Sequence, residues 1–412
     1  MQQLREHIYV SMAQYLLLRP MKLAWLLFLI ALLVSVAFLA VVYVYYQIKN
    51  EGSNEIFFFG VTYGSNTTSE AKLLIDRVKG YTNLFVVNSW DISENETALT
   101  EICEYAVDAK MNVIVYFDYI FYDVKPWLWL RTWLNTAKER WGDKFLGIYL
   151  YDEPGGNQID TGQWRTGPFA KKDMENASDY SDAANRFVTS IRSSLCMQNA
   201  KNTSLPIFTS DYALYWFDYL AGYDTVFVEL GWNHSRTQQI ALCRGAANEQ
   251  EKDWGAIITW TYYEPPYIAN GPEIYQDMLT AYRAGAKYVI VFNYPKYPET
   301  NQYGILTEEH FTAMKQFWNY VHAYPYMYGK VDGQVAFVLP KDYGWGMRRT
   351  QYIREDKIWG FWPEDKKMQL IGENMAILIN KYDLKLDIIY DDPQFNFEEK
   401  YSEIYFWNST IT

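Results

Sequence analysis

Several residue types and motifs are scarce in this chain of 412 residues, and their scarcity excludes whole classes of chemistry. The four histidines are His7, His234, His310 and His322, and no two of them have the spacing of a zinc motif such as His-Glu-x-x-His. No Gly-x-Ser-x-Gly elbow is present, which argues against a serine esterase of the α/β-hydrolase type. The sequence therefore predicts neither a metal site nor a cofactor.

Basic residues are also in the minority. Lysine and arginine total 37 against 49 aspartates and glutamates, and the net charge is -12 at pH 7. No cluster of lysine and arginine interrupts this acidic balance, whereas the phosphates of nucleic acid require a basic surface. We therefore expect no nucleic-acid partner.

One segment near the N-terminus has no charge at all. Leu23 to Tyr46 reads LAWLLFLIALLVSVAFLAVVYVYY. At about 1.5 Å per residue, a helix of this length crosses a hydrocarbon core of about 30 Å with some tilt. A cleaved signal peptide fits poorly, because its apolar region is only about 7 to 15 residues long and a small-residue cleavage site follows it. We predict a transmembrane helix at 23–46.

The flanking charges predict the orientation of this helix. Lys49 alone closely follows the span, whereas three basic residues precede it, Arg5, Arg19 and Lys22. Residues 1–22 should then form a cytoplasmic tail, with the main domain extracellular or lumenal. The sequence has six glycosylation sequons, all after the span, at Asn66, Asn95, Asn176, Asn202, Asn233 and Asn408. In that oxidising setting a disulfide between Cys196 and Cys243 is one possibility. Three cysteines are too few for a fold held together by disulfides.

After a linker at 47–54, short β-branched or aromatic runs alternate with longer helical patterns. Eight runs precede residue 300, at 55–64, 82–90, 111–119, 145–152, 205–211, 224–231, 256–262 and 288–294. Their near-continuous apolar character favours parallel pairing. An open doubly wound sheet usually has fewer strands, and no Gly-x-Gly-x-x-Gly follows any run. We predict a (β/α)8 TIM barrel at 55–328.

A second α/β pattern follows the barrel. Strand-like runs at 333–340, 384–392 and 403–408 flank a helical pattern at 365–382. The sequence therefore predicts a small α/β satellite domain at 329–412.

In a (β/α)8 barrel, catalytic groups lie at the carboxyl ends of the strands. Carboxylates fall at these places in the sequence: Asp118, Asp152, Glu153, Asp211, Glu229 and Glu264. Any single one of them is about as often a helix cap as a catalytic group. Glu153 and Glu264 stand out, because strands four and seven face each other across a barrel of eight.

The segments around this pair resemble the clan A glycoside hydrolases. Tyr151-Asp152-Glu153-Pro154 is similar to their Asn-Glu-Pro motif, and Trp260 to Pro265 carries Glu264 where their nucleophile ends strand seven. The resemblance implies Glu153 as general acid/base and Glu264 as nucleophile, about 5 to 5.5 Å apart if configuration is retained. Asp152 stands where the clan has an asparagine that binds the sugar 2-hydroxyl. Glu229 remains an alternative second carboxylate, together with Asp118 or Asp211.

Aromatic residues are abundant, with 16 Trp and 37 Tyr, and their rings can stack on the apolar faces of sugars. The candidate sugar contacts nearest the predicted mouth are Tyr63, Asn88, Trp90, Tyr119, Trp232, Trp260, Tyr262 and Asn293, with Asp118, Asp152, Asp211 and Glu229. We also expect the long loop at 155–181 to act as a lid. The segment at 341–365, with Tyr343, Trp345, Trp359 and Trp362, is expected to lean over the mouth.

The sequence thus predicts a membrane-anchored, extracytoplasmic glycoside hydrolase, with a retaining mechanism, acting on an extracellular or cell-surface glycan. The alternative is a catalytically silent carbohydrate-binding or cell-surface protein on the same barrel, since one fold hosts many functions. The geometry of the carboxyl groups at the mouth distinguishes the two.

Overall fold

The computed structural model describes residues 32–33, 35–36, 57–117, 119–121, 125, 127–159, 177–232, 234–261, 268–294, 304, 306–344 and 367–411. The chain divides into two units, Met1–Ile56 and Phe57–Thr412. In the first unit, Leu32, Leu33, Ser35 and Val36 are helical and exposed. No helix within these described ranges is long and apolar enough to cross a membrane. Most of 23–46 lies outside them, so the transmembrane helix stays a prediction.

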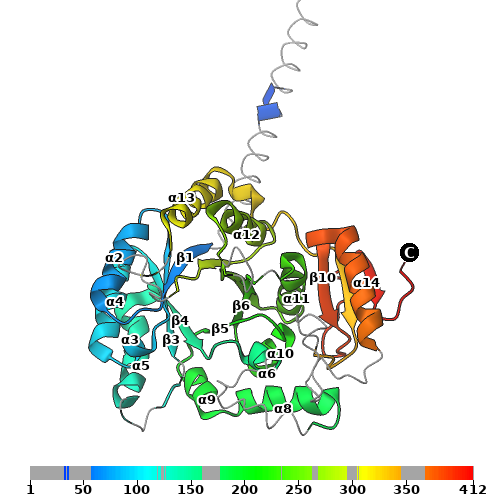
Figure 1. The fold of residues 1–412 in the computed structure, drawn as a ribbon, viewed down its shortest axis with the longest axis horizontal. Helices are drawn as coiled ribbons and strands as arrows, with labels where there is room; N and C mark the ends of the chain where they lie inside the picture. Colours follow the sequence, from blue (N-terminus) through cyan, green and yellow to red (C-terminus); the bar gives the residue numbers. More distant parts are fainter. Residues whose placement is uncertain are drawn as a thin grey trace, which may run out of the picture. The chain divides into compact units, whose positions relative to one another are not determined.

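Eight parallel strands of the second unit close into a barrel, as the alternating pattern predicted (Figure 1). Each strand pairs with the next in the sequence, and β8 pairs with β1 to complete the circle. The strands are β1 (Phe58–Tyr63), β2 (Leu84–Val87), β3 (Asn112–Phe117), β4 (Phe145–Leu150), β5 (Ile207–Asp211), β6 (Thr225–Leu230), β7 (Asp253–Ile258) and β8 (Tyr288–Val291). This part of the chain is a TIM barrel.

Helices surround the strands (Figure 1). They are α2 (Thr68–Val78), α3 (Trp90–Ser93), α4 (Glu96–Asp108), α5 (Leu130–Trp141), α6 (Pro154–Ile159), α8 (Tyr180–Arg192), α9 (Leu195–Lys201), α10 (Tyr215–Ala221), α11 (Arg236–Glu249), α12 (Gly271–Arg283) and α13 (Glu308–Ala323). Side chains fix several of their first turns: Asn270 and Thr307 form reciprocal capping boxes with Glu273 and His310. His310 is therefore a buried helix cap.

The side chains of each strand alternate between two cores. One set packs outward against the helices, and the other fills the barrel. Tyr149 of β4, Phe208 of β5 and Phe227 of β6 belong to the inner set. Two residues further along their strands, Ser210 and Glu229 face the same way. The barrel interior thus ends in a polar layer at the carboxyl ends of β4, β5 and β6.

The C-terminal region forms a parallel three-stranded sheet in the order β10-β9-β11, as the second α/β pattern predicted. Its elements are β9 (Val335–Leu339), α14 (Lys367–Tyr382), β10 (Leu386–Tyr390) and β11 (Glu403–Phe406). The sheet lies beside α11 (Figure 1). A Cβ at Gly245 of α11 would lie 2.7 Å from the Ile388 carbonyl oxygen, so glycine permits this close approach.

A buried ion pair joins the C-terminal sheet to α11. Arg244 Nε donates to Asp387 Oδ1 at 2.7 Å, and the two residues are 2% and 0% exposed. The guanidinium also donates to the backbone carbonyls of Val331, Leu384 and Leu386. Asn248 and Tyr401 donate to the other Asp387 oxygen at 3.2 and 3.1 Å. This network satisfies the polar atoms that the pair takes out of water.

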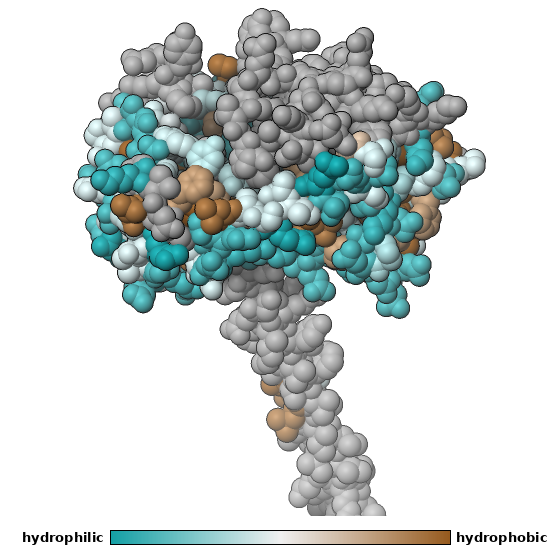
Figure 2. All heavy atoms as spheres, turned by 90° about the horizontal axis from the view of Figure 1, so that it is seen from below, coloured by the Kyte–Doolittle hydropathy of each residue, from teal (hydrophilic) through white to brown (hydrophobic). Residues whose placement is uncertain are grey.

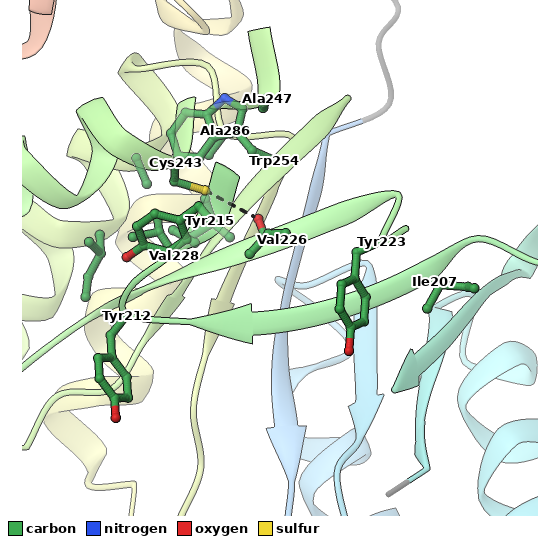
Figure 3. Close-up of a cluster of buried hydrophobic side chains, with 14 of the residues drawn as sticks. Ile207, Tyr212, Tyr215, Tyr223, Val226, Val228, Cys243, Ala247, Trp254 and Ala286 are labelled. Atoms are coloured by element: carbon green, nitrogen blue, oxygen red, sulfur yellow. Dashed lines mark hydrogen bonds between the residues drawn. The ribbon is translucent and has the colours of Figure 1, made fainter. Parts of the chain in front are cut away.

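The bridge between Cys196 and Cys243 that the sequence left open is not formed, because all three cysteines are free and buried. Cys243 Sγ on α11 donates to the Val226 carbonyl of β6 at 3.7 Å (Figure 3). Cys196 Sγ on α9 instead accepts a hydrogen bond from the backbone nitrogen of Ile120 at 3.4 Å. The two thiols pack against different parts of the barrel wall, since α9 contacts β4 and α11 contacts β6.

The surface shown in Figure 2 is mostly hydrophilic over its described part, and hydrophobic residues form small separate groups there. Scattered apolar residues of this kind are normal on a protein surface. That face therefore has no large described apolar patch that would indicate a protein partner.

Replacing Arg244 with alanine should lower the free energy of unfolding by about 3 to 5 kcal/mol, because Asp387 would stay buried without its cation. Denaturant titration of the full chain measures this loss. Lys79→Ala removes an exposed pair with Asp76 and serves as the control, which should change little. An equally small loss in both variants would mean that the buried pair does not hold the C-terminal sheet.

Candidate active site

Asp152 and Glu153 follow β4 in a turn with an uncommon backbone conformation. Tyr151 and Glu153 have φ values of 60° and 48°, in the left-handed region that disfavours residues with a Cβ. The Glu153 backbone nitrogen donates to the Ser210 carbonyl at 3.1 Å, which ties the turn to β5. Strained backbone next to paired carboxyls is typical of a functional site.

Asp211, the last residue of β5, supports this turn from the neighbouring strand. Its carboxylate accepts backbone N–H groups from Gly155 at 2.5 Å, Gly156 at 2.8 Å, Tyr212 at 2.7 Å and Ala213 at 3.1 Å. A Cβ at Gly155 would lie 2.8 Å from Asp211 Oδ2, so the tight turn requires glycine. Asp211 is fully buried and both its oxygens are engaged. It therefore positions the turn, whereas the sequence suggested a sugar contact.

A chain of short oxygen contacts joins the ends of β4, β5 and β6. The Tyr149 hydroxyl lies 2.6 Å from Asp152 Oδ1 and 2.7 Å from Ser210 Oγ. Ser210 Oγ in turn lies 2.6 Å from Glu229 Oε1. Glu229 is 3% exposed, Glu153 is partly buried, and Asp152 keeps an exposed surface. The chain thus runs from the barrel interior to the mouth.

The carboxyl groups of this site perturb one another. Burial, followed by the charges of Glu229, Asp152 and Asp211, holds the pKa of Glu153 well above its usual range. Burial first, then the charge of Asp152, raises the pKa of Glu229 to about 8. Burial also raises the pKa of Asp152, and it raises that of Asp211 to about 7 despite four N–H donors. Among the described residues, no basic side chain is a main influence on these pKa values, so burial and the neighbouring carboxyl groups favour the protonated forms of Glu153 and Glu229.

Two predicted carboxyl groups, Asp118 and Glu264, and the predicted sugar-stacking ring of Tyr262 lie outside the described residues. The separation between Glu153 and Glu264 therefore stays a prediction. Within the described residues, no group of three or more His, Cys, Asp or Glu side chains is arranged to hold a metal ion.

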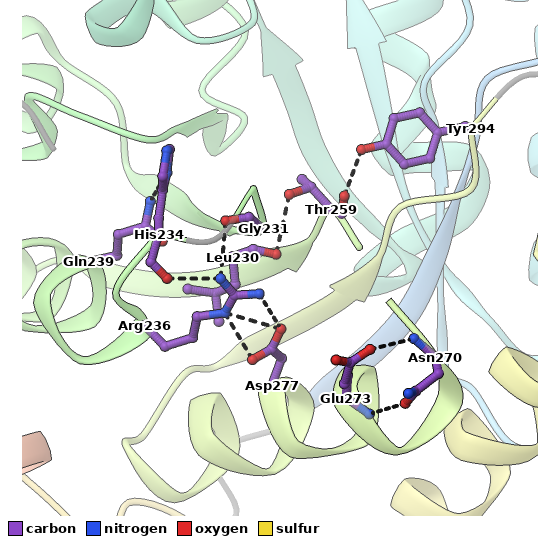
Figure 4. Close-up of polar contacts among 10 residues, drawn as sticks. All are labelled: Leu230, Gly231, His234, Arg236, Gln239, Thr259, Asn270, Glu273, Asp277 and Tyr294. Atoms are coloured by element: carbon purple, nitrogen blue, oxygen red, sulfur yellow. Dashed lines mark hydrogen bonds and ion pairs between the residues drawn. The ribbon is translucent and has the colours of Figure 1, made fainter. Parts of the chain in front are cut away.

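The residues that border the Glu264 segment are firmly held. Thr261 pairs with Ile268 in an antiparallel bridge, so the segment between them leaves and returns at one place. Tyr294 donates to the Thr259 carbonyl at 2.7 Å (Figure 4). Its hydroxyl also lies 3.0 Å from Thr261 Oγ1. The Trp232 backbone nitrogen donates to the Thr261 carbonyl at 2.9 Å. The ends of β6, β7 and β8 are thus joined beside this segment.

The loop after β6 is fixed by Arg236. Its Nη1 donates to the carbonyls of Gly231 at 3.1 Å and His234 at 2.8 Å, and Nη2 pairs with Asp277 at 3.0 Å (Figure 4). In the sequence, Trp232 lies between Gly231 and His234, and its backbone φ is 48°. Its partly buried ring meets the Tyr212 ring edge-on at 6.1 Å. Trp232 is therefore held at the mouth with part of its surface open.

The predicted sugar-stacking rings fall into two groups. Tyr63 and Trp260 are 0% and 1% exposed. Their polar atoms bond to the carbonyls of Thr67 and Phe292, so both rings pack in the core and present no face to a sugar. Trp90, in contrast, is 40% exposed and meets the partly buried Tyr119 ring at 5.7 Å.

The two predicted asparagines also differ. Asn293 is fully buried, and its Oδ1 accepts from the Leu306 backbone nitrogen at 3.4 Å, which indicates a role in the loop after β8. Asn88 is partly buried directly after β2, and its backbone nitrogen donates to the Tyr63 carbonyl at 2.8 Å. Asn88 thus remains a candidate sugar contact together with Trp90, Tyr119 and Trp232.

The segments expected to cover the mouth are described only at their edges. Residues 160–176 and 345–366 lie outside the described residues, including Trp345, Trp359 and Trp362. Tyr343 is buried against the Tyr180 ring at 4.7 Å, and Ser181 donates to Asp342 at 2.6 Å. The start of the segment at 341–365 therefore contacts the end of the loop at 155–181.

Sequence reasoning missed Tyr149 and Ser210, which connect the carboxyl groups. Both occupy inward positions near the ends of their strands. Strand alternation places Ser210 on the same side as Phe208, two residues earlier, but the structure is needed to show that this side faces the barrel interior.

Solved structures with a similar fold are mostly glycoside hydrolases. GH5_18 from Streptomyces cattleya in complex with GlcNAc matches with a TM-score of 0.51 and 11% identity, covering 85% of this chain and 98% of that one. A variant of the same enzyme in complex with Manβ1-4GlcNAc matches with a TM-score of 0.52 and 12% identity, with the same coverage of both chains. Alpha-L-fucosidase isoenzyme 2 from Paenibacillus thiaminolyticus gives 0.47 and 12%, over 85% of this chain and 60% of that one. At such identities the similarity is evidence of the fold alone.

No protein-family model matches the sequence, and no curated protein matches it.

The raised pKa of Glu229 should make stability depend on pH. A carboxyl with a pKa of about 8 in the folded chain and about 4.3 unfolded stabilises the fold at low pH, and this contribution is lost as pH rises toward 8. Between about pH 5 and 8, the free energy of unfolding of the wild-type chain should fall with rising pH. In Glu229→Gln this fall should be smaller by up to about 1.4 kcal/mol per pH unit. Denaturant titrations across this range measure the slope. Glu398→Gln, at an exposed carboxyl, should keep the wild-type slope; a wild-type slope in Glu229→Gln would contradict the raised pKa.

Proposed function

We propose that this chain is a glycoside hydrolase with its active site at the carboxyl ends of the barrel strands and Glu153 as the general acid. The observation that carries the proposal is the setting of Glu153. Glu153 follows β4 in a strained turn held by Asp211, and burial together with three neighbouring carboxyl groups raises its pKa, which favours the protonated form. Hydrolysis of a glycosidic bond needs such an acid to protonate the leaving oxygen.

The second catalytic carboxyl is assigned to Glu264. A nucleophile must be ionised, and Glu229 is both 3% exposed and raised to a pKa of about 8. Glu229 is therefore poorly suited to attack an anomeric carbon. Glu264 follows β7, across the barrel from β4, which is the position that the clan A resemblance implies. The reaction would retain configuration through a glycosyl ester on Glu264.

The competing function is carbohydrate binding without catalysis. Burying several carboxyl groups together without a cation costs stability, and proteins tolerate this cost mainly where chemistry requires it. Sugar binding alone needs stacking rings and hydrogen-bonding groups but no raised pKa. The carboxyl cluster therefore favours an enzyme.

The substrate and the location extend the proposal. We propose that residues 23–46 anchor the chain in a membrane, with the barrel outside the cytoplasm facing extracellular or cell-surface glycans. Support comes from the uncharged run of the sequence, its flanking charges and the sequons. GH5_18 from Streptomyces cattleya holds GlcNAc or Manβ1-4GlcNAc, so short glycans of these sugars are the first substrates to assay.

Removing either catalytic carboxyl should reduce glycan hydrolysis by several powers of ten. Glu264→Gln should abolish the glycosyl ester, because an amide cannot form it. Glu153→Gln should slow natural glycans far more than activated aryl glycosides, whose leaving groups scarcely need protonation. Rates on both substrate types measure the difference, with Glu398→Gln as an exposed control. Wild-type rates in both active-site variants would refute the assignment.

Deleting residues 1–50 should release the chain from membranes, because the only long uncharged apolar run is lost. Fractionation of cells expressing the full and shortened chains, with a high-salt wash, measures retention. The full chain should stay in the membrane pellet and the shortened chain in the supernatant. Retention of the shortened chain would show that another part binds the membrane.

A further inference from the structure

The contacts between Tyr149, Ser210, Asp152 and Glu229 require one more proton than the hydroxyls provide. The oxygen pairs Asp152–Tyr149, Tyr149–Ser210 and Ser210–Glu229 are 2.6, 2.7 and 2.6 Å apart. Contacts this short each hold a proton between the two oxygens. The tyrosine and the serine supply one proton each. The third must come from a carboxyl group at one end of the chain.

Two arrangements satisfy all three contacts. In one, protonated Glu229 donates to Ser210, Ser210 to Tyr149, and Tyr149 to Asp152. In the other, every hydrogen bond points the opposite way and Asp152 carries the proton. The two forms differ in the direction in which both hydroxyl groups donate and in which carboxyl group carries the proton. The total number of protons is the same in both.

The surroundings favour a stored proton on Glu229. Its Oε2 is buried and meets no hydrogen-bond donor of good geometry among the described residues, although the Glu153 carboxyl lies close enough to interact with Glu229. A neutral carbonyl oxygen tolerates this better than a carboxylate oxygen does. Among the described residues, the titratable groups that interact with Glu229 beyond the chain itself are Glu153 after β4, Asp211 at the end of β5 and Tyr215 on α10. None of them is a cation that would draw the proton away.

We propose that Glu229, Ser210, Tyr149 and Asp152 form a proton wire, which exchanges one proton between the buried Glu229 carboxyl and the carboxyl of Asp152, a residue that reaches the surface at the mouth. For transfer outward, Glu229 gives its proton to Ser210 Oγ, Ser210 gives its own to Tyr149, and Tyr149 gives its own to Asp152. Glu229 becomes the anion and Asp152 the neutral acid. Ser210 and Tyr149 are positioning residues in this process.

The use of the wire rests on the proposed function. When Glu153 gives its proton to a leaving group, its negative charge appears beside Asp152. Glu229 and Asp152 are the two neighbours whose charges act most strongly on Glu153. The wire keeps one proton between these two carboxyl groups, so one of them stays neutral while Glu153 is ionised, which limits the repulsion. If the chain is a glycosidase, Ser210→Ala and Tyr149→Phe should shift the pH profile of kcat while leaving KM nearly unchanged.

Exchange of the Glu229 proton with solvent tests the wire without any substrate. The infrared spectrum of the full chain at neutral pH should contain a protonated-carboxyl band that disappears in Glu229→Gln. After transfer into D2O, this band should shift as deuterium replaces hydrogen through Asp152. Ser210→Ala removes the link to Glu229 and should slow the shift by about tenfold or more. Tyr149→Phe leaves only the longer contact of 3.3 Å between Ser210 Oγ and Asp152 Oδ1, so it should slow the shift by a smaller but measurable factor.

Matched controls separate the wire from general packing. Thr209→Val removes the neighbouring hydroxyl, which bonds to the Tyr151 carbonyl at 3.3 Å, and Tyr288→Phe alters another tyrosine of the inner core. Both should exchange at the wild-type rate. Absence of a Glu229-dependent band, or wild-type exchange in Ser210→Ala and Tyr149→Phe, would overturn the wire and leave glycan hydrolysis to stand alone. Hydroxyl-dependent exchange in a chain that cleaves no glycan would support the wire and count against the proposed function.

Discussion

The hydrogen bonds of the Asp211 carboxylate determine the geometry of the candidate site. They connect the end of β5 to the first turn of α6, and so keep the backbone of Glu153 in a conformation that residues with a Cβ disfavour. Gly155 and Gly156 allow the approach because neither has a Cβ in the way. Without this support the turn could relax, and Glu153 would no longer meet the carboxyl groups of β5 and β6. The acid is thus positioned by backbone contacts made by a neighbour.

Electrostatics at the mouth follow from burial and from like charges. Acidic groups on β4, β5 and β6 lie together, and hydroxyl and backbone N–H groups provide their main hydrogen bonds. A lysine or arginine in their place would ionise the carboxyl groups and remove the acid. The hydroxyl groups of Tyr149 and Ser210 do not force the carboxyl groups to ionise, because a hydroxyl can bond to a carboxyl group in either protonation state. The arrangement keeps protons available near neutral pH.

The strand order was predictable from the sequence, but the direction of side chains within each strand was not. All eight barrel strands and the three C-terminal strands were expected near their observed places. Parallel barrel strands are apolar on both faces, so the sequence does not show which alternate set points inward. Tyr63 and Trp260 end strands on the outward side, where they pack against helices, while Ser210 and Glu229 end strands on the inward side. The separate positions of Cys196 and Cys243 depend on which helix covers which strand, and that too needs the folded chain.

Helix α11 is buried on nearly every side, because the barrel covers one face and the C-terminal sheet the other. Its residues therefore belong to two cores at once. During synthesis the barrel strands emerge first, yet this helix finds its second partner only when β10 and β11 have left the ribosome. The barrel wall at α11 is consequently completed by the last part of the chain, and a ribosome that stops early would release a barrel in which Arg244 lacks the carboxylate and the carbonyls that bind it.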